Sequence, residues 1–223
     1  MNWLPFAAVF GIFFLTHSLP VRPKVKSRLV SMLGPRGFTF VYSISSLGMV
    51  IWLVAAAGNA PFVLLWDQAP WQRYTIFFGM LLVCLLFALT IGRPNPFSFG
   101  GFHDERFDPH RPGLIRWISH PMLLALAGWS ALHVLPNGDL AHTILFGVFA
   151  VFALAGMAIV DRRKQRLLGK LEWVSLRQTV ASAPLFPMQT SWTEFWLRVG
   201  AGAFGFILLL ILHPVVLGVS PLH

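Results

Sequence analysis

Acidic residues are scarce in this chain, and so are charges of either sign. Eight Asp and Glu stand against 17 Lys and Arg, and charged residues make up 11% of the 223 positions. Soluble domains carry about 25% charged residues, so the composition excludes an ordinary soluble protein. Hydrophobic residues make up 56% of the chain, and we therefore predict an all-α integral membrane protein.

Cysteine is nearly absent as well. The single cysteine, Cys84, excludes an intrachain disulfide. It stands in an apolar run beside Val83 and Leu85, where burial argues against a reactive thiol. We interpret Cys84 as a packing residue within a helix.

Long apolar runs, by contrast, recur along the whole chain. A helix rises about 1.5 Å per residue, so about 18 or more apolar residues cross a hydrocarbon core of ~30 Å. Six runs predict transmembrane spans at about 3–19, 38–57, 75–92, 120–135, 141–160 and 195–219. The fourth is short for a span unless its helix begins earlier, near Leu114. No Lys or Arg precedes the first run and no small-residue cleavage site follows it, so we interpret it as a retained span rather than a secretory signal.

Basic residues alternate from loop to loop. The first, third and fifth loops hold five, four and six Lys and Arg, whereas the second holds one and the fourth none. Because cytoplasmic loops are enriched in Lys and Arg, this alternation predicts six spans with both termini on the outer, periplasmic side of a bacterial inner membrane. Five spans would break the alternation. The basic loops that set the orientation in the membrane thus account for the net charge of +9. We therefore do not expect nucleic acid as a partner.

Two loops and one turn have a distinctive composition. Residues 93–112 are rich in Pro, Gly and charge, which predicts irregular backbone. Residues 163–178 mix Leu and Trp with Arg and Lys, which suits a helix lying in the membrane interface, with a plain solvated loop as the alternative. Asn137-Gly138 predicts a tight turn between the fourth and fifth spans. If the fourth helix begins at His120-Pro121, Pro121 occupies its first turn, where proline is tolerated.

The eight histidines are the main candidates for chemistry, because an ionisable side chain inside a span is costly without a partner. Three of them, in loops or at the chain end, are expected to be solvated: His103, His110 and His223. The other five fall into two layers: His17 and His120 near the inner ends of their spans, and His133, His142 and His213 near the outer ends.

Depth and spacing restrict which histidines act together. Imidazole ligates haem iron and zinc, but zinc usually takes three or four protein ligands, and we expect no carboxylate near the histidines. Haem is therefore the preferred cofactor. His120 and His133 lie thirteen residues apart, which on a helix separates them by about 20 Å and about 140°, so they do not share one iron. Depth alone favours His17 with His120 and His133 with His213.

Four segments of the sequence resemble one known family. They are Thr16–Ser18 (THS), Arg111–Met122 (RPGLIRWISHPM), Trp129–Asp139 (WSALHVLPNGD) and Glu172–Phe186 (EWVSLRQTVASAPLF). In this order they resemble the NnrU family of bacterial membrane proteins, which is named for its link to nitrite and nitric oxide reduction and is related to the 15-cis-ζ-carotene isomerase of plants and cyanobacteria. The resemblance implies one NnrU-like transmembrane domain over residues 1–223.

The resemblance also implies a cofactor. The isomerase relatives carry haem b, and their histidine ligands look similar by motif to His17 and His133 here, with His120 and His213 as the alternates that depth favours. The sequence departs from the family pattern at three positions: Ser119 replaces a common arginine, Pro136 replaces a small residue, and Ser130 corresponds to a cysteine near the isomerase's second ligand. The last change makes carotene isomerisation less expected than family membership.

Three functions therefore stay open. The first is a haem b-binding membrane protein that serves nitrogen-oxide reduction, as in denitrification, or the assembly of its machinery. The second is a haem-dependent cis–trans isomerase of a carotenoid or other polyene. The third is a non-enzymatic scaffold, whose Gly200, Gly202 and Gly205 permit close helix packing. The expected partners are the lipid bilayer and either a lipophilic substrate or respiratory membrane proteins.

Overall fold

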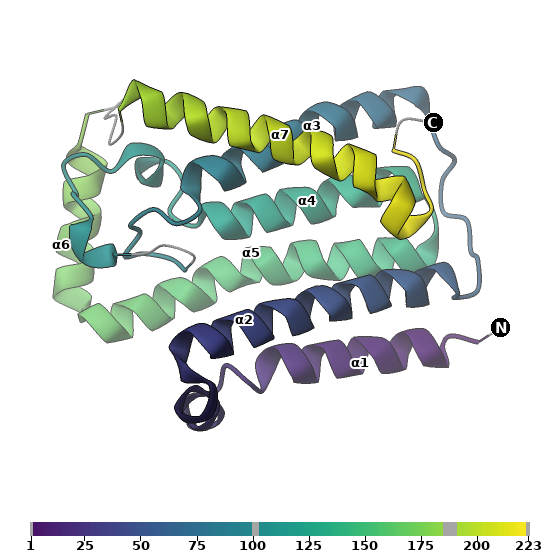
Figure 1. Cartoon of the computed structure of the whole chain (residues 1–223), viewed down its shortest axis with the longest axis horizontal. Helices are drawn as coiled ribbons and strands as arrows, with labels where there is room; N and C mark the ends of the chain where they lie inside the picture. The colour runs from purple at the N-terminus through teal and green to yellow at the C-terminus, as the bar shows by residue number, and fades with distance from the viewer. Residues whose placement is uncertain (1, 100–102, 185–190, 222–223) are drawn as a thin grey trace. The chain divides into compact units, whose positions relative to one another are not determined.

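The chain is almost entirely helical in the computed structural model, which describes residues 2–99, 103–184 and 191–221. Its helices, labelled in Figure 1, are α1 (Leu4–Ser18), α2 (Pro23–Gly58), α3 (Pro70–Thr90), α4 (Pro121–Asn137), α5 (Leu140–Leu168), α6 (Lys170–Ser182) and α7 (Trp192–Leu217). Two 3-10 turns, Asp104–Arg106 and Gly113–Arg116, lie between α3 and α4. Over the described ranges, extended pairing is limited to an isolated bridge between Leu64 and Asp139. The predicted all-α class is confirmed.

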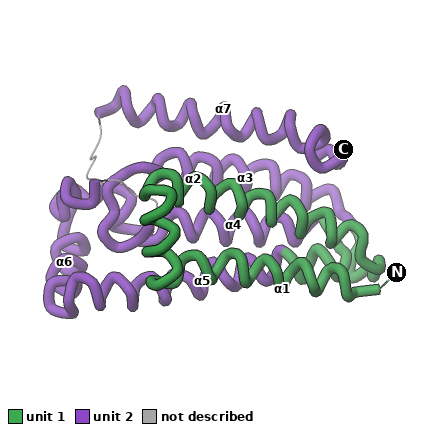
Figure 2. Tube along the Cα trace, turned by 60° about the horizontal axis from the view of Figure 1, so that its bottom comes forward, with its two compact units in different colours: residues 1–67, 137–145 green, residues 68–136, 146–223 purple. Residues whose placement is uncertain are grey.

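Two compact units make up the chain, coloured separately in Figure 2. The first unit contains residues 1–67 and 137–145, and the second contains residues 68–136 and 146–223. The boundary runs through α5, so the first residues of that helix belong to one unit and the rest to the other.

In the first unit, α1 packs against α2, and the segment after α2 pairs with the turn before α5. Leu65 N donates to Gly138 O at 2.7 Å, and Leu140 N donates to Val63 O at 2.9 Å. Gly138 has φ +59°, and a Cβ there would collide with the Trp66 carbonyl oxygen. The predicted Asn-Gly turn is therefore confirmed, and the close backbone approach explains why glycine occupies it.

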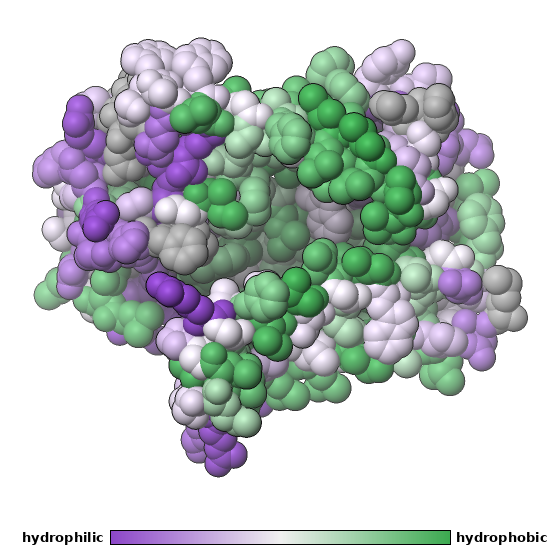
Figure 3. All heavy atoms as spheres, viewed as in Figure 1, coloured by the Kyte–Doolittle hydropathy of each residue, from purple (hydrophilic) through white to green (hydrophobic). Residues whose placement is uncertain are grey.

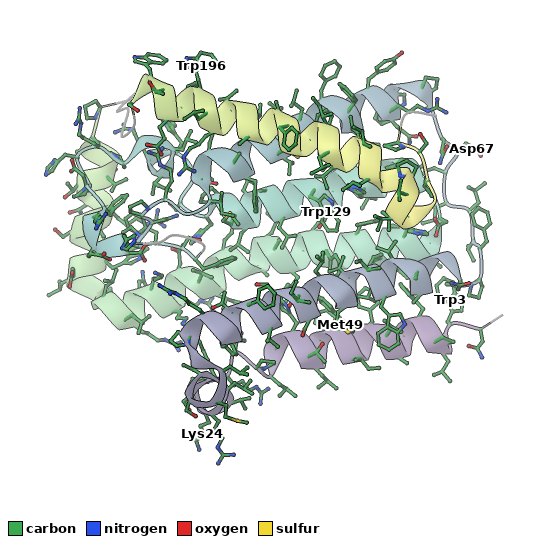
Figure 4. The ribbon with its side chains drawn as sticks, viewed as in Figure 1. Trp3, Lys24, Met49, Asp67, Trp129 and Trp196 are labelled. Carbon is green, nitrogen blue, oxygen red and sulfur yellow. The ribbon has the colours of Figure 1, made fainter. Side chains whose placement is uncertain are left out.

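Helix α2 is longer than the span predicted at 38–57. It begins at Pro23 and includes most of the residues expected to form a loop, with a kink at Gly34, where φ is 71° and ψ is 165°. Pro35 follows, and proline has no N–H to donate and clashes with the preceding turn. The chain resolves this conflict by bending at the glycine, so a basic helical segment that includes Lys24 precedes the apolar one (Figure 4).

In the second unit, α3 and α7 pack closely along their length. A Cβ built on Gly202 of α7 would lie 3.1 Å from Ala88 Cβ, Cys84 O and Leu85 Cα of α3. The rings of Phe77 and Phe206 meet edge to face, with centroids 5.1 Å apart. Cys84 thus lies in the interface between two helices, as its interpretation as a packing residue requires.

Helices α4, α5 and α6 complete the second unit. Helix α4 begins at Pro121, as expected, and packs on α5 through a cluster of Leu123, Ala127 and Ala153, with Met157 and Val160 against it. At Gly169, with φ +85°, α5 ends and α6 begins. The expected helix over 163–178 therefore forms as the end of α5 and a separate α6.

Among the residues that the structure describes, four helices are long and apolar enough to cross a membrane: α2, α3, α5 and α7. Helices α1 and α4 have 15 and 17 residues, fewer than the ~20 that a span usually needs. Six spans with both termini outside therefore stay a prediction. Large apolar side chains point outward, such as Val151 (67% exposed) and Val215 (78% exposed), and in Figure 3 hydrophilic residues gather around α6 instead. Such a surface is consistent with a lipid bilayer.

Candidate functional site

A polar cluster forms where the segment before α4 meets α5 and α6 in the second unit. Its members are Asn95, Ser98, Ser119, His120, Asp161 and Arg177. His120 immediately precedes α4 and is 6% exposed, and its Nδ1 lies 3.1 Å from the Ser98 hydroxyl. On the other side of the ring, Nε2 lies 3.2 Å from Asp161 Oδ1. Both ring nitrogens thus lie beside polar atoms of the polar cluster, and the contact of Nε2 with Asp161 is a charge contact rather than a hydrogen bond.

Arg177 connects the polar cluster to α6. Its guanidinium donates to Asp161 Oδ1 at 3.1 Å and to the Ser119 hydroxyl. The guanidinium carbon lies 4.8 Å from the ring centroids of both Phe97 and Trp173, so the cation is held between two aromatic faces. This arrangement suits arginine, because a planar guanidinium stacks on rings while its N–H groups bind oxygens.

The electrostatics of the polar cluster favour a neutral histidine. Burial lowers the pKa of the His120 imidazole below its ordinary value of 6.5, against the pull of the Asp161 carboxylate, and Arg177 acts in the same direction as burial. Ser98, His120 and Asp161 follow the hydroxyl–imidazole–carboxylate order of an acyl-transfer triad. Ser98, however, is only 2% exposed, and Asp161 is already paired with Arg177. The polar cluster is therefore better suited to joining three segments than to attacking a substrate.

A second feature of this unit is an apolar cleft of about 60 Å³ that contains two histidines. Its lining includes Ile76, Phe77 and Met80 of α3, His133 of α4, and Phe206 and His213 of α7. We call it the histidine cleft. The sequence placed His133 and His213 at similar depth, and the structure brings both to this one cleft.

Both histidines of the cleft engage a backbone carbonyl through Nδ1. His133 Nδ1 donates to Trp129 O one turn earlier on α4 at 2.7 Å, beside the Trp129 side chain labelled in Figure 4. His213 Nδ1 donates to Val219 O at 2.6 Å, because Gly218, with φ +73°, turns the chain back at the end of α7. Because a carbonyl oxygen only accepts, Nδ1 of each ring carries the proton.

His17 lies in the first unit, near the end of α1. The Tyr42 hydroxyl of α2 donates to His17 O at 3.0 Å, and its oxygen lies 3.1 Å from His17 Nδ1 and 3.4 Å from His17 Nε2. The His17 ring also stacks on Phe13, with centroids 5.3 Å apart. His17 is therefore held between Tyr42 and Phe13 near the end of α1.

The expectation that no carboxylate lies near the membrane histidines is wrong. Asp161 contacts His120, and Asp139 Oδ2 lies 2.8 Å from His142 Nδ1. Asp161, Arg177 and Ser98 were not predicted as site residues. Asp161 was detectable, because it is the only acidic residue between Leu140 and Leu171. The roles of Ser98 and Arg177 depend on contacts with residues far away in sequence, and no local pattern marks them.

The remaining histidines fit simpler roles. His103 pairs with Glu105 at 3.0 Å, with both side chains largely exposed, and His110 is exposed. His223 lies outside the described residues. Across the ranges that the structure covers, no three His, Cys, Asp or Glu side chains gather as a metal site.

Whether these residues fit a haem depends on which part of the site is considered. His17 and His133 fit as imidazole donors by residue type, and each ring is oriented by a nearby oxygen, from Tyr42 and from the Trp129 carbonyl. His120 fits less well, because its Nδ1 lies 3.1 Å from the Ser98 hydroxyl and its Nε2 lies 3.2 Å from the Asp161 carboxylate. The histidine cleft by itself, at about 60 Å³, is also far below the ~300–1,000 Å³ of pockets for small organic ligands. His133 and His213 therefore do not enclose a porphyrin between them.

Comparison with known proteins agrees with the sequence resemblance. A family model described as NnrU protein matches residues 5–221. No curated protein and no solved structure matches the chain. Because the family match spans nearly the whole chain, this protein belongs to the NnrU family.

Proposed function

We propose that this protein is an integral protein of the bacterial inner membrane that holds a b-type haem and serves nitrite and nitric oxide reduction or the assembly of that machinery. Membership of the NnrU family supports the process. The observation that carries the cofactor proposal is that the rings of His17 and His133 are each oriented by a nearby oxygen.

His17 and His133 are the residues that would hold the iron. When bound, the haem supplies reversible one-electron chemistry. The chain orients both imidazole rings: Tyr42 holds the His17 ring, and the Trp129 carbonyl holds the His133 ring. Such outer partners fix the tautomer and orient the ring, and losing one typically weakens metal binding about 10–100-fold.

The isomerase alternative has less support. Ser130, which stands where the isomerase has a cysteine, is fully buried, and its hydroxyl donates to Leu126 O at 2.9 Å. A hydroxyl that is hydrogen-bonded within its own helix is a poor replacement for a thiol that takes part in exchanging the ligands of an iron. Of the three glycines behind the scaffold alternative, only Gly202 lies against a neighbouring helix, whereas Gly200 and Gly205 have no atom within 4 Å of a built Cβ.

The proposal is tested by expressing the chain under haem-replete conditions and recording reduced-minus-oxidised spectra of the purified protein. We expect a Soret band that is lost in His17→Ala and in His133→Ala and retained in the matched control His142→Ala. Tyr42→Phe should weaken haem retention about 10–100-fold while leaving the helical content unchanged. A colourless wild-type protein, or a band that survives both ligand substitutions, contradicts the haem proposal.

A further inference from the structure

The start of α2 is a basic helical segment, residues 23–33, to which the proposed function assigns no role. It ends at the Gly34 kink. Figure 1 shows it nearly end-on, as the coil below the α2 label, while the rest of α2 lies across the view, so the two parts of the helix run in different directions. From its charge, its exposed apolar side chains and this bend, we propose that the basic helical segment lies along the membrane surface and binds the headgroups of anionic phospholipids.

The length of α2 requires part of it to lie outside the hydrocarbon core. Its 36 residues would extend about 54 Å as a straight helix, whereas the hydrocarbon core is ~30 Å thick. Residues 34–58 alone extend about 38 Å, which is enough to cross the core with a tilt. The kink therefore lies near one surface of the membrane, and the basic helical segment lies beyond the core.

The basic helical segment has a polar side and an apolar side. Helical spacing places basic and hydroxyl side chains on one of them: Lys24, Ser27, Arg28 and Ser31. The other side carries four apolar side chains: Val25, Leu29, Met32 and Leu33. The rest of the chain leaves Met32 79% exposed and Leu33 46% exposed. An amphipathic basic helix of this kind inserts its apolar side about 5–10 Å into the boundary between headgroups and acyl chains.

The positive charge of the basic helical segment has no counter-charge in its own part of the chain. The first 66 residues contain five Lys and Arg and no Asp or Glu. Lys24 and Arg28 are exposed, and among the residues that the structure describes no carboxylate forms an ion pair with either. Anionic headgroups supply the missing negative charge, whereas zwitterionic headgroups carry no net charge. Each Lys or Arg near such a surface strengthens binding by about fivefold.

Lys26 has a different role from Lys24 and Arg28. Its ammonium lies 5.7 Å from the centroid of the Phe38 ring, and Phe38 is a buried residue on the far side of the kink. This cation–π contact connects the two parts of α2 and stabilises the bend between them. Gly34 has φ 71°, a conformation that glycine adopts without strain. The bend is therefore present in the chain by itself and orients the basic helical segment for binding.

The test uses the full chain in lipid nanodiscs with one labelled cysteine. Cys84→Ala removes the native thiol, and either Met32→Cys or Ser27→Cys then carries a fluorescent label on the apolar or the polar side. The nanodiscs contain a mixture of phosphatidylcholine and phosphatidylglycerol. Acrylamide, a neutral and water-soluble quencher, should quench the label at position 27 strongly and the label at position 32 weakly, because only the apolar side enters the membrane.

Spin-labelled lipids then identify the headgroup beside the basic helical segment. Spin-labelled phosphatidylglycerol should quench the label at position 32 more than spin-labelled phosphatidylcholine does. Lys24→Gln and Arg28→Gln should each lower this preference about fivefold, whereas the charge-preserving pair Lys24→Arg and Arg28→Lys should keep it. The matched control is Arg162→Gln with Arg163→Gln, which removes two exposed charges from α5 and should leave the preference unchanged.

Three results overturn the proposal. The first is equal quenching by the two spin-labelled lipids, and the second is acrylamide quenching at position 32 as strong as at position 27. The third is protection of position 32 that rises with the number of chains per liposome, because a second copy of the chain would then cover the apolar side. None of these residues belongs to the proposed haem site, so either proposal can fail while the other stands.

Discussion

The packing of α7 on α3 makes a prediction that depends on one glycine among three. Gly200, Gly202 and Gly205 lie on the same helix, but only Gly202 lies against α3, where a Cβ would come within 3.1 Å of Ala88 Cβ, Cys84 O and Leu85 Cα. Two of these three atoms belong to the backbone, so they cannot rotate away. We therefore predict that Gly202→Ala is destabilising and that Gly200→Ala and Gly205→Ala are not.

The magnitude follows from two opposed effects. Overpacking a well-packed interface costs about 1–3 kcal/mol, whereas replacing glycine with alanine inside a helix gains about 1 kcal/mol. All three substitutions share the helix gain, so the difference between Gly202→Ala and Gly200→Ala isolates the contact at about 1–3 kcal/mol. For a chain of this size, about 1 kcal/mol shifts the melting temperature by roughly 2–4 °C. The expected gap is therefore about 2–12 °C.

Thermal unfolding in one detergent, followed by the fluorescence of a thiol probe or by loss of the monodisperse peak, measures this gap. Because Cys84 lies in the same interface, a thiol probe also reports whether the helices separate at the site of the substitution. If Gly202→Ala melts at the same temperature as Gly200→Ala, the close approach of α7 to α3 is wrong.

Two further predictions concern the polar cluster. Because burial lowers the pKa of His120 below 6.5, the unfolded chain binds a proton at this residue more readily than the folded chain. The contribution of neutral His120 to stability is therefore complete above about pH 6.5 and is lost as the pH falls through the folded pKa. On acidification the melting temperature should fall more steeply for the wild type than for His120→Gln, and equal slopes would refute the assignment. Asp161→Asn removes the charge that pairs with Arg177 at 3.1 Å and should lower the free energy of unfolding by about 1–3 kcal/mol. This is less than the ~3–5 kcal/mol for breaking a fully buried pair, because both side chains remain partly solvated. The exposed Glu105→Gln serves as the control and should melt like the wild type.

Much of the helical organisation was predictable because its signals are local. Apolar runs place α1, α3, α4, α5 and α7 within a few residues of their observed ends, apart from the basic extension of α5 to Leu168. Pro121 marks the start of α4, and Asn137-Gly138 marks the turn into α5. The extension of α2 back to Pro23 was missed because Gly34 and Pro35 resemble the end of a loop, whereas here they kink a helix that continues on both sides.

The sequence by itself determined the membrane class, the family and the residues able to ligate a metal, because composition, apolar run length and side-chain chemistry do not depend on packing. Only the tertiary structure decided which of those residues meet. It places the His120 ring between Ser98 and Asp161, and it brings His133, His213 and Met80 to one small cleft. The physical reason is that helix periodicity determines which residues share a face within one helix, whereas contacts between helices depend on how those faces pack together.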